Sequence, residues 1–139
     1  MSRFLLDTNV ISAMVKPKPH SGVMHWIATA GEALLYFSVV TLGEIRKGIA
    51  APEAGRRAQF EAWLSALANR FADRILPIDL AVAERWGHLT GNCRARGQTL
   101  PVVDGLLADT ALHYDLIFVT RNVKDMQATG VNTLDPWNL

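Results

Sequence analysis

Residues 3–11 read RFLLDTNVI, a short apolar run that leads directly into an acid, Asp7. The run at 3–6 predicts a β-strand, and the apolar residues at 10–15 predict a short helix. An acid at such a junction is either a turn residue or the first ligand of a binding site. The rest of the chain has to decide between these two interpretations of Asp7.

The same alternation of apolar runs and amphipathic stretches continues along the chain. Further strands are expected at 35–40, 75–78 and 116–119, with a last extended segment at 131–134. Helices are expected at 23–30, 41–50, 57–69, 80–96, 102–113 and 123–128. Strands that alternate with helices indicate an α/β fold with a parallel sheet covered on both faces. In such sheets ligands bind beyond the carboxyl ends of the strands.

Length and composition set the frame for this fold. The chain has 139 residues, half of them apolar, which fits one domain over 1–139 with a core of its own. No apolar run approaches the ~20 residues that cross a bilayer, and no leader segment is visible. Cys93 is the single cysteine, which excludes an intrachain disulfide and a cysteine zinc cluster. We therefore expect a soluble cytoplasmic protein.

Four acids occupy the positions that the strand-end rule marks. Asp7 directly follows the first strand, and Glu44 lies one helical turn after the second. Asp104 opens the helix at 102–113, and Asp125 lies one turn after the strand at 116–119. Because parallel strands end at the same edge of the sheet, these acids are candidates for one shared site.

Local explanations compete with this interpretation for Glu44 and Asp125. Thr41 and Glu44 have the spacing of a capping box, in which the two side chains satisfy the amides at a helix start. Asn122 and Asp125 have the same spacing with an Asn cap. Taken singly, each of these acids is better explained by capping.

Asp7 and Asp104 are harder to explain in this way. Asp7 could be a turn acid before a helix capped by Thr8 or Asn9, but a buried strand delivers it to the sheet edge. The helical dipole favours Asp104 by only ~0.3–1 kcal/mol. Its face continues through the inward stripe of Leu107, Ala108 and Ala111. A carboxylate there costs several kcal/mol unless it is paired or binds a metal.

Considered together, the four acids predict a metal site. Clustered carboxylates repel one another unless a cation is present, and Mg²⁺ or Mn²⁺ takes oxygen ligands. Such a site suits phosphodiester hydrolysis, in which the metal lowers the pKa of a water and steadies the leaving oxygen. The chain has no Gly-rich phosphate loop and no G-x-S-x-G elbow. Its four histidines show no metal-ligand spacing with one another.

Four motifs together resemble a known family. LLDTNVI (5–11), VVTLGEI (39–45), VVDGLLADTAL (102–112) and LIFVTRNVKD (116–125) resemble the PIN domain. More narrowly, the pattern is similar to the VapC toxins of toxin–antitoxin pairs, in the FitB-like branch. The resemblance covers nearly the whole chain and implies a single PIN domain, a three-layer α/β/α sandwich with a central parallel sheet. It also implies a metal-dependent endoribonuclease.

The resemblance assigns roles to particular residues. The acidic site, catalytic and metal-binding, falls on Asp7, Glu44, Asp104 and Asp125, with Mg²⁺ as the cofactor and Mn²⁺ as a substitute. Asn9 would support Asp7, while Thr120 and Asn122 would orient water or substrate. The implied partners are an RNA substrate, a cognate antitoxin of VapB type, and a second copy of the chain in a homodimer.

One position departs from the family pattern. Asp109 stands where relatives of this branch commonly carry a small apolar residue. It lies about 140° around the helix from Asp104, so we place it outside the metal site. His113, four residues further on, is a suitable partner for it.

Basic and aromatic residues admit two interpretations. The net charge is +1, and local clusters include Arg46 with Lys47 and Arg121 with Lys124. Cations beside an acidic site suit phosphate contacts, although surface salt bridges also explain Arg46 and Lys47. The four tryptophans, at 26, 63, 86 and 137, are interpreted as core or dimer-contact residues rather than base-stacking platforms.

Three other function classes remain open at this stage. A receiver or phosphoryl-transfer domain would carry a second Asp two residues after Asp7, and LLDTN has none. A non-catalytic interaction module on the same fold is disfavoured by the presence of all four acids. A PIN nuclease outside toxin–antitoxin biology would be distinguished by its gene neighbourhood.

Overall fold

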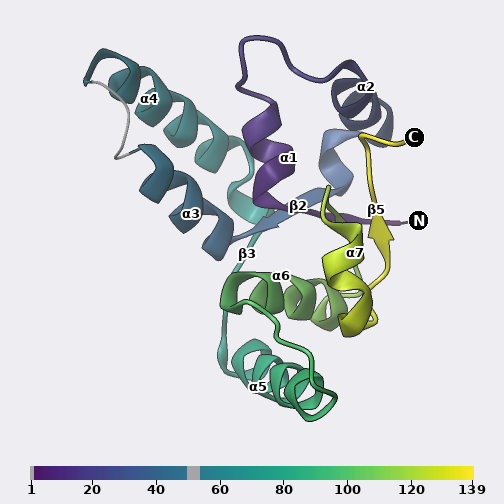
Figure 1. Ribbon diagram of the computed structural model, residues 1–139. Coiled ribbons are helices and arrows are strands. Elements are labelled where there is room, and N and C mark those ends of the chain that lie inside the picture. The colour runs from purple at the N-terminus through teal and green to yellow at the C-terminus, as the bar shows by residue number, and fades with distance from the viewer. Residues whose placement is uncertain (1, 50–53) are drawn as a thin grey trace.

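Residues 2–49 and 54–139 are described by a computed structural model, and within them five short strands form one parallel sheet (Figure 1). The strand order is β3-β2-β1-β4-β5. The strands are β1 (Phe4–Leu6), β2 (Leu35–Ser38), β3 (Ile75–Leu76), β4 (Ile117–Val119) and β5 (Thr133–Leu134). The central strand β1 pairs with β2 on one side and with β4 on the other. All the carboxyl ends therefore meet at one edge, as predicted.

Helices cover both faces of this sheet (Figure 1). One face carries α1 (Thr8–Ala13), α2 (Ser21–Ala30), α3 (Val39–Ile49) and α4 (Ala54–Arg70). The opposite face carries α5 (Leu80–Ala95), α6 (Val102–His113) and α7 (Val123–Met126). The predicted three-layer α/β/α sandwich is therefore confirmed. None of the helices in the described ranges is long and apolar enough to cross a membrane.

The alternation of side chains along each strand explains why helices pack on both faces of the sheet. Leu6 and Phe37 enter the core under α1 and α2, whereas Leu5 and Phe118 enter the core under α6. Successive residues of a strand point to opposite faces, so a strand that is apolar at every position has two faces to bury.

The predicted helices and strands are all found, with bounds that shift by up to about three residues, and the shift at the junction after β2 affects the site. The strand predicted at 35–40 ends at Ser38, and α3 begins at Val39. The Ser38 hydroxyl accepts a hydrogen bond from the Val40 amide at 3.1 Å, which is the geometry of a helix N-cap. Thr41 is thus inside the first turn and fully buried, so the competing explanation of Thr41 and Glu44 as a capping box is wrong. The predicted last residue of this helix, Ala50, lies outside the described residues.

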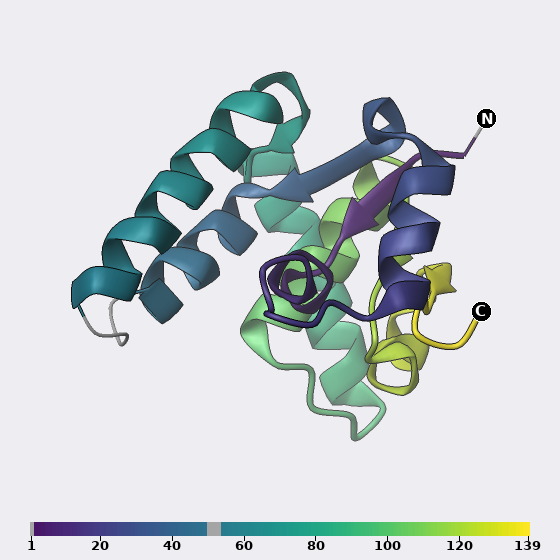
Figure 2. The ribbon, with the colours of Figure 1, turned by 90° about the horizontal axis from the view of Figure 1, so that it is seen from above.

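Helices α3 and α4 run side by side and project from the sheet as a two-helix arm (Figure 2). Ile45 and Ile49 of α3 are buried in the same core as Leu64 and Leu67 of α4. Trp63 is partly buried against that core, in agreement with its predicted structural role.

Candidate active site

A cavity of about 430 Å³ opens at the carboxyl edge of the sheet. Three of the four predicted acids line it, and each comes from a different segment: Asp7 after β1, Glu44 in α3 and Asp104 in α6. The remaining lining residues are Thr8, Asn9, Ser12, Lys16, Arg121, Asn122 and Trp137. The parallel topology brings Asp7 and Glu44 together, because the strands that precede them end at the same edge, and the start of α6 brings Asp104 to that edge.

Asp7 is held by contacts on both carboxylate oxygens. Its Oδ1 accepts a hydrogen bond from the Thr8 amide at 2.7 Å, and its Oδ2 accepts one from the buried Thr120 hydroxyl at 2.7 Å. Asp7 is itself the N-cap of α1, so the alternative in which Thr8 or Asn9 caps this helix is wrong. Each carboxylate oxygen keeps a further lone pair, which leaves Asp7 able to cap the helix and to bind a cation.

Glu44 is tied to the start of α1 rather than to its own helix end. The Thr8 hydroxyl donates a hydrogen bond of 2.6 Å to Glu44 Oε1. Thr8 thereby connects the two acids, since its amide contacts Asp7 and its hydroxyl contacts Glu44. Asp104 approaches from α6, where Leu107, Ala108 and Ala111 are buried as the stripe predicted.

The acids influence one another electrostatically. Burial raises the pKa of Asp7, and the charges of Asp104 and Glu44 raise it further, against hydrogen bonds from Thr120 and Thr8 that lower it. Burial also raises the pKa of Asp104, with added contributions from Asp125 and Glu44. The charges at this edge therefore repel one another, which is the condition that a bound cation relieves.

Asp125 stands apart from the other three acids. It is exposed and does not line the cavity, although its charge raises the pKa of Asp104. In the described ranges, no three His, Cys, Asp or Glu side chains lie close enough together to hold a metal ion. The structure thus gathers three of the predicted acids in one cavity and leaves the fourth beside it.

The three polar residues with predicted supporting roles occupy different environments. Thr120 is fully buried and does not line the cavity, and its hydroxyl donates a hydrogen bond to Asp7. Its hydroxyl also accepts a hydrogen bond from the Asn122 amide at 3.0 Å. Asn122 lines the cavity, as does Asn9. Asn9 Oδ1 is buried without a hydrogen-bond partner among the described residues, and the hydrogen bonds to the Asp7 carboxylate come from Thr8 and Thr120.

Sequence reasoning missed four residues of the cavity. Thr8, Ser12 and Lys16 are spaced by four along the chain, and this helical spacing could have placed them on one face. Trp137 follows β5 closely, so the strand-end rule applied to the last strand would have found it. It is also partly packed against the core, so the predicted core role holds only in part.

The basic residues divide between the two predicted roles. Arg46 forms an exposed ion pair with Glu61 at 3.1 Å, which supports the salt-bridge interpretation for this residue. Arg121 and Lys16 line the cavity beside the acids, whereas the neighbouring Lys124 does not.

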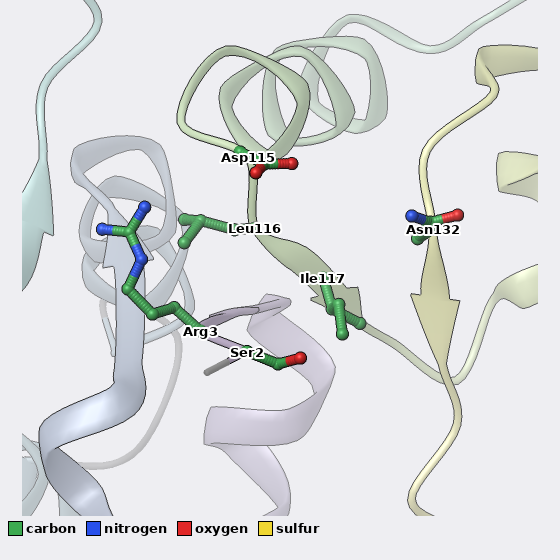
Figure 3. A pocket seen from close by; sticks show the side chains of 6 residues that line it. All are labelled: Ser2, Arg3, Asp115, Leu116, Ile117 and Asn132. Atoms are coloured by element: carbon green, nitrogen blue, oxygen red, sulfur yellow. The ribbon is translucent and has the colours of Figure 1, made fainter.

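A second cavity, of about 480 Å³, lies at the opposite edge of the sheet (Figure 3). Arg3 precedes β1 there, and its guanidinium donates to the Tyr114 carbonyl at 3.0 Å. Asp115 ends α6 with a φ of 56°, and the next amide, of Leu116, bonds to the Ala111 carbonyl at 2.8 Å. This is the left-handed residue of a Schellman helix end, so these groups have structural explanations.

Asp109 is fully buried between α5 and α6. Arg85 forms an ion pair with it, with 3.5 Å between Arg85 Nε and Asp109 Oδ1. The predicted partner, His113, also acts on Asp109 through its charge. Burial raises the pKa of Asp109 to about 6, against the charges of Arg85 and His113 that lower it. Asp109 does not line the acidic cavity, which agrees with its exclusion from the metal site.

A parallel α/β sandwich with carboxylates at the carboxyl edge of its sheet belongs to the class of folds that bind phosphorylated ligands and hard cations there. The chain belongs to the PIN-domain family, whose model matches residues 4–130. It is 34% identical over 135 residues to the VapC ribonuclease Y4jK of Sinorhizobium fredii, a match that covers 96% of each chain. It is 32% identical over 136 residues to the toxin FitB of Neisseria gonorrhoeae, covering 96% and 98% of the two chains.

The comparison with solved structures agrees with this assignment. The crystal structure of FitAcB from Neisseria gonorrhoeae matches with a TM-score of 0.93 at 31% identity, over 98% of this chain and 99% of that chain. The predicted family and fold are therefore confirmed.

Proposed function

We propose that this protein is a metal-dependent endoribonuclease that acts as the toxin of a VapBC-type toxin–antitoxin pair. The observation that carries the proposal is the cavity in which Asp7, Glu44 and Asp104 converge from three segments. Burial raises the pKa of Asp7 and of Asp104, and neighbouring carboxylate charges raise both further. The names of the relatives, a VapC ribonuclease and a FitB toxin, support the same activity.

The donor set fits Mg²⁺ or Mn²⁺. Asp7, Glu44 and Asp104 offer carboxylate oxygens, the ligands that hard cations prefer, and no sulfur atom of a described residue lines the cavity. Asp125, whose charge raises the pKa of Asp104, would complete the set. When bound, the metal activates a water and stabilises charge on the phosphate. The acidic side chains of the described residues are too far apart to hold an ion as they stand. We therefore expect them to move closer together when the ion binds.

The chain's own residues have distinct tasks in this proposal. Thr120 and the Thr8 amide fix the carboxylate of Asp7, and the Thr8 hydroxyl fixes that of Glu44. Fixed carboxylates reduce the reorganisation that accompanies the reaction. Asn9 and Asn122 line the cavity with amide groups that can donate hydrogen bonds to water or to a phosphate oxygen.

The proposed partners follow from the relatives. The matched FitAcB and FitAB structures support a cognate antitoxin of VapB type, and the ribonuclease names support an RNA substrate. We also propose that the protein forms a homodimer, which light scattering of the purified protein would test. The alternatives are a PIN nuclease without an antitoxin and a non-catalytic module. A gene for a small DNA-binding protein immediately upstream would favour the toxin over the first alternative.

The decisive experiment incubates total RNA with the purified protein in Mg²⁺ or Mn²⁺, in EDTA, and with the Asp104→Asn variant. We expect discrete fragments with metal, and none with EDTA or with the variant. Asp73→Asn is the matched control, because Asp73 is an exposed acid distant in the fold from the cavity lining, and it should cleave like the wild type. Equal RNA patterns in all samples would contradict the proposal and favour the non-catalytic module.

A further inference from the structure

An aromatic ring from the C-terminal turn and an arginine that follows β4 meet in the acidic cavity. The centre of the Arg121 guanidinium lies 5.2 Å from the centroid of the Trp137 ring, and both residues line the cavity. Arg121 follows β4 and Trp137 follows β5, the adjacent strand at the edge of the sheet. A contact of this kind attracts the cation to the ring face.

The ring is itself held in place from several directions. The Trp137 amide donates to Asp135 Oδ1 at 2.9 Å, and Asn138 Nδ2 donates to Asp135 Oδ2 at 2.7 Å. Pro136 between them is buried, and the ring of His20, at the start of α2, lies 6.4 Å from that of Trp137. Asp135 thus closes a tight turn whose shape fixes the position of the tryptophan.

Arg121 shares the cavity with three carboxylates but pairs with none of them. Within the described part of the chain, its guanidinium has no ion pair and no hydrogen bond to Asp7, Glu44 or Asp104. A guanidinium that fell among these acids would neutralise them and compete with a metal ion. The contact with Trp137 holds the guanidinium at the ring, and its N–H groups are available for a phosphate, which a guanidinium can bind through two hydrogen bonds.

We infer that Trp137 is a positioning residue that holds Arg121 for a phosphate of the RNA strand next to the acidic site. This inference rests on the proposed ribonuclease function and adds a phosphate subsite to it. Lys16, which follows α1, also lines the cavity and adds a second positive charge to it. The cavity then has a side that binds cations and a side that binds the substrate backbone.

The test measures binding of a short, labelled, single-stranded RNA of random sequence, in Mg²⁺, on the Asp104→Asn background so that the RNA stays intact. Arg121→Ala should weaken binding about ten-fold, as expected for a charge-assisted contact. It should also reduce the slope of log affinity against log salt by roughly 0.7, the value for one phosphate contact on a single strand. Arg94→Ala, an exposed arginine of α5 outside the cavity, should change neither quantity.

Trp137 variants separate positioning from base stacking. Trp137→Leu should lower both the affinity and the salt slope, and it should add little in the presence of Arg121→Ala, because it acts through that residue. Trp137→Phe keeps an aromatic face and should restore most of the affinity. If Trp137→Leu lowers affinity with an unchanged slope and adds fully to Arg121→Ala, the ring stacks on a base and the inference is wrong.

Two further outcomes separate this inference from the function on which it rests. Wild-type cleavage together with normal RNA binding by the Arg121 and Trp137 variants would overturn the phosphate subsite alone. Absence of both cleavage and RNA binding in the wild type would overturn the ribonuclease proposal and the subsite with it. A lower melting temperature of Trp137→Leu with unchanged RNA binding would reduce Trp137 to a structural residue.

Discussion

Asp7 satisfies two requirements that compete in the sequence. It caps α1 through the Thr8 amide, and it presents a buried carboxylate to the cavity beside Glu44 and Asp104. Helix capping uses one lone pair of a carboxylate and leaves others for a cation. The two interpretations of this acid, as a turn residue and as a metal ligand, are therefore compatible with each other.

Asp7→Asn separates the two roles. Asn is as good an N-cap as Asp, so α1 should remain formed, and removal of a buried charge should relieve repulsion among the acids. We expect cleavage of RNA to be abolished while the melting temperature in EDTA stays equal to that of the wild type or rises. Circular dichroism and the RNA assay measure these outcomes. A large fall in melting temperature would show that the carboxylate has a structural role instead.

From its hydrogen bond to the Asp7 carboxylate, we expect Thr120 to affect the site through Asp7. Thr120→Val keeps the shape of the side chain but removes the 2.7 Å hydrogen bond to the carboxylate. Loss of such an outer partner typically lowers metal affinity or activity by about 10- to 100-fold. We expect a shift of that size in the Mn²⁺ concentration at half-maximal cleavage, and Thr120→Ser should recover it. Normal metal dependence of Thr120→Val would remove Thr120 from the site.

At the scale of elements, the sequence predicts the strand ends well and the contacts between them poorly. Helix 102–113 has its predicted bounds, because its apolar stripe and the loop before it are local signals. The hydrogen bond from Thr8 to Glu44 joins residues 36 apart, and that from Thr120 to Asp7 joins residues 113 apart. Such contacts depend on strand order and register, which no local pattern specifies.

The α5–α6 interface contains a buried acid, Asp109 of α6, whose protonation depends on pH and which pairs with Arg85 of α5. Asp109 has a pKa raised to about 6 in the folded protein, against 3.8 for an unperturbed Asp. The folded state therefore holds this proton more tightly, and its stabilising effect is complete below about pH 4 and disappears as the pH rises past about 6. Relative to Asp109→Asn, the wild type should lose about 2–3 kcal/mol across this window.

Urea unfolding in EDTA at a series of pH values measures this difference. The comparison with Asp109→Asn cancels the contributions of Asp7 and Asp104, which both proteins share. Arg85→Gln should move the loss of stability to higher pH, because the arginine lowers the pKa of Asp109. Parallel stability curves for wild type and Asp109→Asn would contradict the prediction.

At the scale of the whole molecule, the fold determines which residues can meet. A TM-score of 0.93 to a structure only 31% identical shows how little of the sequence the sheet order requires. The cavity draws on the ends of β1, β2, β4 and β5, so its residues span from Asp7 to Trp137. Asp7 and Glu44 could be predicted because they follow strands with strong apolar signals, and Asp104 because it lies on the apolar stripe of its helix. Trp137 was missed although the extended segment before it was predicted, because a tryptophan near the C-terminus has the same sequence signal whether it packs in the core or lines a cavity.

Metal binding at this edge should stabilise the entire fold. A ligand that binds only the folded state stabilises it by about 2.7 kcal/mol when present at about 100 times its dissociation constant. For a domain of this size that corresponds to a rise of roughly 8–10 °C in melting temperature. We expect Mn²⁺ to raise the melting temperature of the wild type and of Asp73→Asn alike, and to raise that of Asp104→Asn much less. Of the three proteins, only Asp104→Asn lacks an acid of the cavity. Equal shifts in melting temperature in all three would therefore mean that the ion binds elsewhere.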